Sequence, residues 1–245
     1  MQETKKQLEI LLVNYFRHVF EGFPKCKVVS SESPDFLLKL NPKKQTGLEL
    51  TRVNPTVTFT CVNDEQVHEL RERIILQATE LFRIHSELPL FVKILFSESK
   101  PIIPERELTV AARLASQITK ATKDKSGGSF FVETISSSQL PEGIKTVLVV
   151  HHPALKEAVW EEANNLGISE DILTDVVSAI EKKDKKLFLY QKRSTDANWL
   201  LITSDRLRGR RNYNVQNQLR KKEFKSEFDH VFLLDLIKGK VFKLV

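Results

Sequence analysis

Two acidic residues, Asp35 and Glu49, stand inside runs whose composition is typical of β-strands. Asp35 opens the run Asp35 to Leu40, and Glu49 lies in the middle of the run Gly47 to Val53. A carboxylate without compensation is costly in an apolar strand, and two of them on adjacent strands repel each other unless a cation lies between them. Because sites made only of oxygen ligands favour Mg²⁺ or Mn²⁺ over zinc, the pair predicts a metal site.

The elements that must position this pair are a helix and a β-hairpin. Apolar residues recur at helical spacing from Gln2 to Phe20, and Gly22 and Pro24 end that helix. A short strand is predicted over Lys27 to Ser30. The turn sequence Asn41-Pro42-Lys43-Lys44 then separates the two strands that carry Asp35 and Glu49, so these strands are expected to be antiparallel neighbours.

The rest of the chain alternates between helical and strand patterns. We expect helices over Asp64 to His85 with Asn63 or Asp64 as N-cap, over Pro104 to Lys123, and over Ser169 to Leu187 with Ser169 as N-cap; strands are expected over Leu90 to Phe96, Lys145 to His151 and Trp199 to Thr203, with a closing hairpin of Val231 to Leu236 and Lys240 to Leu244. This order predicts a single α/β domain over residues 1–245, with 64–142 partly an elaboration on it.

The pattern around the acidic pair resembles a known superfamily. The PD-(D/E)XK nucleases, which share the restriction-endonuclease-like fold, place Pro-Asp at the start of one strand and Glu-x-Lys on the next, after an N-terminal helix. Pro34-Asp35 and Glu49-x-Thr51 match this in order, spacing and context. The C-terminal half also looks like the tail of uncharacterised bacterial members, in the segments Ala179 to Tyr190, Asn198 to Ile202 and Phe228 to Leu233.

The resemblance implies a mixed central sheet flanked by helices and a Mg²⁺- or Mn²⁺-dependent endonuclease that hydrolyses phosphodiester bonds of nucleic acid, with DNA favoured. Asp35 and Glu49, with the Leu50 carbonyl, are expected to hold the metal. Some members of the fold add a carboxylate from a helix, and Glu9 is the candidate here because it borders the apolar face of the first helix. A surface glutamate is the other interpretation of Glu9.

The family lysine is replaced by Thr51, which can hydrogen-bond a water but supplies no charge. Three accounts are open: a lysine from elsewhere fills the gap, the metal alone activates the water, or the protein binds nucleic acid without cutting it. The candidates for the first account lie near the end of a late helix and are Lys182, Lys183, Lys185 and Lys186, among which Lys182 and Lys186 are taken as catalytic candidates. An inactive nucleic-acid-binding module, or an adaptor in a defence system, is the alternative function.

A basic stretch offers a surface for phosphates. The net charge is +6, and one polar segment contains the candidate nucleic-acid-binding residues Arg206, Arg208, Arg210, Arg211 and Lys221 together with Tyr213. A solvated basic loop is the other interpretation of this stretch. The sequence leaves a homodimer open.

Other features argue against further chemistry. His151-His152 has no third ligand at metal-like spacing, and Gly127-Gly128-Ser129 lacks the lysine of a phosphate loop. Cys26 and Cys61 show no CxxC spacing and are expected to be reduced thiols. With no secretory signal or membrane-spanning run in the sequence, we expect a cytoplasmic location.

Overall fold

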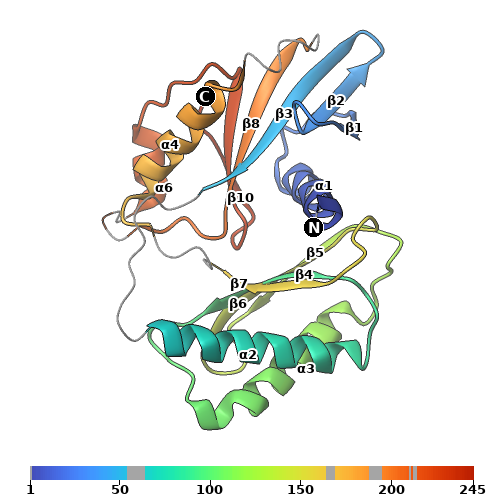
Figure 1. Ribbon diagram of the computed structural model, residues 1–245, viewed down its shortest axis with the longest axis vertical. Helices are drawn as coiled ribbons and strands as arrows, with labels where there is room; N and C mark the ends of the chain where they lie inside the picture. Colours follow the sequence, from blue (N-terminus) through green and yellow to red (C-terminus); the bar gives the residue numbers. More distant parts are fainter. Residues whose placement is uncertain (1, 54–63, 164–168, 188–194, 210, 212–213) are drawn as a thin grey trace. The chain divides into compact units, whose positions relative to one another are not determined.

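The computed structural model describes residues 2–53, 64–163, 169–187, 195–209, 211 and 214–245. Its described residues form an α/β protein with two mixed β-sheets and five α-helices, which confirms the predicted class (Figure 1). The chain divides into two compact units: Met1–Tyr15 with Thr60–Asn165, and Phe16–Phe59 with Leu166–Val245. The segment 64–142, expected as an elaboration, lies in the first unit, which has a sheet and a core of its own.

The second unit is built on a six-stranded sheet in the order β1-β2-β3-β8-β9-β10. Its strands are β1 (Lys27–Ser30), β2 (Phe36–Asn41), β3 (Lys44–Arg52), β8 (Ala197–Ser204), β9 (His230–Asp235) and β10 (Lys240–Lys243). The pairs β1–β2, β2–β3 and β9–β10 are antiparallel, whereas β3–β8 and β8–β9 are parallel. The predicted antiparallel pairing of β2, which follows Asp35, with β3, which contains Glu49, is therefore confirmed, with Phe36 opposite Leu48.

The two faces of this sheet are covered differently. Because side chains alternate along a strand, Glu49, Thr51 and Val53 point to one face of the sheet, and Leu48 and Leu50 to the other. Helix α4 (Ile172–Asp184) packs on the face to which Glu49 points, which we call the α4 face. The core buried between this helix and the sheet includes Val176, Ile180, Leu200, Ile202, Val231 and Leu233. On the opposite face, Phe16 and Phe20 of helix α1 (Gln2–Val19) lie 5.2 and 4.9 Å from the ring of Phe232.

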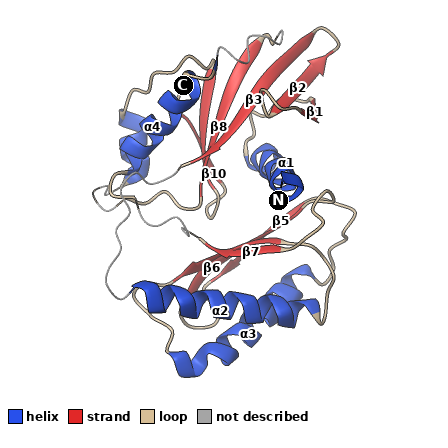
Figure 2. Ribbon diagram, in the orientation of Figure 1, coloured by secondary structure: helices blue, strands red, loops and turns tan. Residues whose placement is uncertain are grey.

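The first unit has a four-stranded sheet in the order β5-β6-β4-β7. Its strands are β4 (Phe91–Phe96), β5 (Phe131–Ser136), β6 (Ile144–His151) and β7 (Val159–Glu162). Figure 2 shows helices α2 (Asp64–Arg83) and α3 (Glu107–Thr122, preceded by the 3₁₀ turn Pro104–Arg106) on one face of this sheet. That face buries apolar residues of both helices and of β4, β5 and β6 in one core.

Four features differ from the predictions. Strands β5 and β7 and helix α6 (Val215–Lys221) were not predicted, and α6 lies within the stretch interpreted as a basic loop. The predicted N-cap Ser169 is wrong: Asp171 caps α4 by accepting from the backbone N–H groups of Leu173 and Thr174. The hydroxyl of Ser169 instead donates to the buried Asp175, so it is not available for capping.

No helix among the described residues is long and apolar enough to cross a membrane.

Candidate active site

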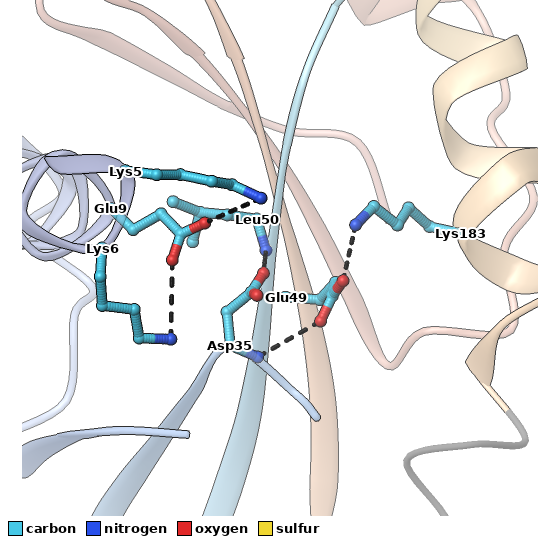
Figure 3. A network of polar contacts seen from close by, with 7 residues as sticks. All are labelled: Lys5, Lys6, Glu9, Asp35, Glu49, Leu50 and Lys183. Carbon is cyan, nitrogen blue, oxygen red and sulfur yellow. Dashed lines mark hydrogen bonds and ion pairs between the residues drawn. The ribbon is translucent and has the colours of Figure 1, made fainter. Parts of the chain in front are cut away.

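The Asp35–Glu49 pair is assembled where strand β2 begins. The backbone N–H of Asp35 donates to Oε2 of Glu49 at 3.3 Å, and Oδ2 of Asp35 accepts from the backbone N–H of Leu50 at 2.8 Å. Since β2 starts at Phe36, opposite Leu48, the N–H of Leu50 lies beyond the paired part of β2. The Asp35 carboxylate thus takes the place of a strand partner, and this fixes it beside Glu49 (Figure 3).

Close packing under Pro34 helps to hold Asp35 in place. Gly47 lies two residues before Glu49, and a Cβ atom at this glycine would be 2.8 Å from Cγ of Pro34 and 2.8 Å from Oδ1 of Asn198. Real Cβ atoms essentially never show contacts this short. The absence of a side chain at Gly47 therefore lets Pro34 lie directly on β3, and Pro34 leads the chain into Asp35.

A lysine from α4 completes the cluster. The Nζ atom of Lys183 donates to Oε1 of Glu49 at 2.6 Å, and the side chains of Lys183 and Glu49 are 19% and 7% exposed (Figure 3). Both oxygens of a nearly buried carboxylate are therefore hydrogen-bonded, one to Lys183 and one to Asp35. This ammonium group stands at the acidic pair, on the α4 face to which Thr51 also points.

The donor set fits a hard divalent cation. Asp35 and Glu49 offer carboxylate oxygens, each of which keeps acceptor capacity besides its present hydrogen bond. The carbonyl of Leu50 points to the same strand edge as its N–H group, which faces Asp35, because the two groups of one strand residue share an edge. Such oxygen ligands suit Mg²⁺ or Mn²⁺. Among the described residues no group of three or more His, Cys, Asp or Glu side chains forms a metal site, so these three would have to hold the cation with water.

The lysine candidates are distinguished by the phase of α4. Lys182 and Lys186, taken from the sequence as catalytic candidates, are exposed, as is Lys185, whereas Lys183 is half-buried and contacts Glu49. Lys183 continues the buried stripe of α4, which contains Ile172, Val176, Ala179 and Ile180. The helical period of 3.6 residues was the sequence signal that could have selected Lys183 from its cluster.

The remaining candidates are placed as follows. Glu9 lies in the part of α1 that belongs to the first unit, where it pairs with Lys5 at 3.8 Å and Lys6 at 3.6 Å; its role in catalysis stays a prediction. Thr51 is half-exposed beside the cluster, and its carbonyl accepts from the hydroxyl of Thr203 at 3.4 Å.

The residues of the basic stretch differ in exposure. Arg211 pairs with Glu170 at 2.9 Å, Arg206 is half-buried, and Arg208 is exposed. Lys221 is exposed in the last turn of α6. Arg210 and Tyr213 lie outside the described residues. Binding of nucleic acid by this stretch stays a prediction.

The paired histidines make structural contacts in the first unit. The ring nitrogens of the buried His151 lie 2.8 Å from the carbonyl oxygen of Pro89 and 2.9 Å from that of Gly127. The ring of His152 accepts from the N–H of Ala154 at 3.0 Å, and burial together with His151 lowers the pKa of His152. Cys26 is a free thiol, as expected, and Cys61 lies outside the described residues.

No protein-family model matches the chain, and neither a curated protein nor a solved structure was found to be significantly similar to it.

Proposed function

We propose that the second unit is a metal-dependent nuclease of the PD-(D/E)XK type, in which Lys183 takes the role of the lysine that Thr51 replaces. The observation that carries the proposal is the contact of 2.6 Å between Nζ of Lys183 and Oε1 of Glu49, next to the Asp35 carboxylate. Two further observations support it. Strands β1, β2 and β3, which follow helix α1 in the chain, form a three-stranded antiparallel meander, and Pro34-Asp35 stands immediately before β2.

Asp35 and Glu49, with the Leu50 carbonyl, would hold Mg²⁺ or Mn²⁺. The bound cation supplies Lewis-acid polarisation of the phosphate and a lowered pKa for water. Lys183 keeps the Glu49 carboxylate oriented through their hydrogen bond, and its ammonium offsets the negative charge that develops on the phosphoryl oxygens as the bond breaks. The Thr51 hydroxyl, on the same face of β3 as Glu49, positions a water by accepting or donating one hydrogen bond.

The experiment that tests the proposal is cleavage of single- and double-stranded DNA and of RNA in the presence of Mn²⁺. The wild type should cut at least one of these, and Glu49→Gln should lower the rate by at least about 100-fold because it removes a charged ligand. The matched control is Asp229→Asn, which alters an exposed carboxylate that accepts from the N–H of Asn198. If the wild type binds nucleic acid but cuts none, the unit acts as an inactive binding module instead.

A further inference from the structure

Judged by the described residues, the α4 face of the six-stranded sheet is covered over one half and open over the other. Over β8 and β9 it is buried under α4, whereas over β1 and β2 its residues Val29 and Leu37 are half-buried and Lys27 and Lys39 are exposed. The registers place Lys27 opposite Lys39, Val29 opposite Leu37, and Lys39 opposite Gln45, so all of them share the face of Glu49. Glu49 therefore lies at the border between the covered and the open half.

The open half has an unusual charge arrangement. Two side chains directly opposite each other on antiparallel strands have Cβ atoms about 5 Å apart, and like charges at such positions destabilise the strand pair. Among the described residues neither Lys27 nor Lys39 has an ion-pair partner. The segment 25–45 holds five lysines, Lys25, Lys27, Lys39, Lys43 and Lys44, against two acidic residues, Glu32 and the site residue Asp35.

We infer that this open half, which we call the Lys27–Lys39 surface, binds the phosphate backbone of the nucleic acid strand that the site acts on. The inference rests on the proposed function for the identity of the polyanion. The geometry comes from β2: Lys39 lies four positions after Asp35, which is about 13 Å along a strand. A backbone that follows β2 with one phosphate at the carboxylates therefore places another phosphate, a few nucleotides away, between the two lysines.

The chemistry of the surface fits such a ligand better than a protein partner. A phosphate between Lys27 and Lys39 would relieve their mutual repulsion, and the half-buried Val29 and Leu37 offer an apolar floor for sugars on the way to Asp35. An acidic side chain near this path is that of Asp196, which is exposed and accepts from the backbone N–H of Gln45 at 2.8 Å. Since Gln45 lies opposite Lys39, this contact is on the β3 side of Lys39 and not on the side of Lys27.

The test compares the full-length wild type with the double variant Lys27→Ala/Lys39→Ala for binding of a fluorescent DNA or RNA oligonucleotide at several salt concentrations without divalent metal. The matched control is Lys145→Ala/Lys243→Ala, which removes two exposed strand lysines elsewhere. Each lost phosphate contact lowers the slope of log K against log salt by about 0.7 on a single strand. The double variant should lose about 1.4 in slope and about 10- to 30-fold in affinity near 0.1 M salt, while the control binds as the wild type does.

Stability distinguishes loss of a contact from loss of the fold. Lys39→Glu turns the like-charged pair into an ion pair, so it should raise the melting temperature by about 1–3 °C while it weakens binding. Weaker binding accompanied by a lower melting temperature would overturn the inference, as would a double variant that binds like the wild type.

Measuring cleavage distinguishes the two proposals. If the double variant loses binding and neither the wild type nor any variant cleaves nucleic acid, the proposed Lys27–Lys39 surface is supported and the proposed nuclease activity is rejected. If Lys27→Ala/Lys39→Ala changes neither cleavage nor binding, the nuclease activity is supported and the proposed surface is rejected.

Discussion

The Nζ atom of Lys183 lies 2.6 Å from Oε1 of Glu49, although 134 residues separate the two along the chain. The contact joins the last turn of α4 to the centre of β3 and neutralises a carboxylate that is almost fully buried. It also brings a cation to the acidic pair beside Thr51, where the PD-(D/E)XK pattern that the sequence resembles has a lysine.

Replacing Lys183 should destabilise the second unit. Lys183→Met keeps most of the side-chain volume but leaves the Glu49 carboxylate buried without its partner, which costs about 3 kcal/mol. Urea unfolding should show this loss, and Lys182→Met, which changes the exposed neighbour, should stay within about 0.5 kcal/mol of the wild type. The double variant Lys183→Met/Glu49→Gln should be more stable than the sum of the single changes predicts. Strict additivity would mean that the pair does not interact in solution.

Changing either acidic residue should remove metal binding. Asp35→Asn and Glu49→Gln keep an acceptor oxygen for Leu50 or Lys183 but lose the negative charge that a divalent cation requires, so Mn²⁺ affinity should fall by at least about 10-fold. Alanine at Asp35 is less informative, since an unsatisfied Leu50 N–H would cost about 1–3 kcal/mol. Titration calorimetry gives the affinity, with Asp196→Asn as the exposed control. Unchanged Mn²⁺ affinity in both site variants would refute the assignment.

Adding one methyl group at Gly47 should displace the residues that hold Asp35 in the site. A Cβ atom there meets Pro34 and Asn198 at 2.8 Å, so Pro34 must move and Asp35 with it. Gly47→Ala should cost about 1–3 kcal/mol and lower metal affinity as well. Gly128→Ala is the control, because its Cβ meets its nearest neighbour at 3.5 Å, an ordinary contact. Wild-type Mn²⁺ affinity in Gly47→Ala would show that Pro34 does not position Asp35.

The stability of the second unit should respond to the ionisation of Asp235. Burial holds the pKa of this carboxyl above its usual value, although the backbone N–H groups of Lys238 and Leu207 oppose the shift. A carboxyl whose pKa is raised by folding contributes stability at low pH, and that contribution is lost as the pH rises through the folded pKa. The stability of the wild type relative to Asp235→Asn should therefore fall from about pH 4 upward.

Urea unfolding at a series of pH values measures this difference. The altered hydrogen bonding of the asparagine adds a constant offset, so the slope with pH is the quantity to compare. If the wild type gained stability over Asp235→Asn as the pH rises, the raised pKa of Asp235 would be contradicted.

The fold around the site could be predicted because its signals are local. Pro34-Asp35, the turn at Asn41-Pro42 and the apolar run through Leu48 and Leu50 define the hairpin, and β2 and β3 follow within a few residues of the expected bounds. Strand β7 and helix α6 give weaker signals: the sequence Val-Trp-Glu-Glu does not alternate, and α6 has only Val215 and Leu219 at helical spacing as buried residues. Division of the chain into two units depends on long-range contacts that no local pattern encodes.

The acidic pair was also within reach of the sequence, because carboxylates in apolar strands are rare. Lys183 was harder to single out, because four lysines crowd the same turn and only the buried stripe of α4 decides which one faces the sheet. The Lys27–Lys39 pair requires the register of β1 against β2, which the sequence of either strand alone does not fix.

The most direct measurement of the central claim is a relocation of the lysine. Mn²⁺-dependent cleavage of DNA and RNA should be compared for the wild type, Lys183→Met, and Lys183→Met/Thr51→Lys, with Lys186→Met as the control from the same helix end. We expect Lys183→Met to lose about 100-fold or more in rate, Lys186→Met to retain the wild-type rate, and Thr51→Lys to restore part of the loss by returning a cation to β3. Cleavage by Lys183→Met at the wild-type rate, or none by the wild type, would contradict the account.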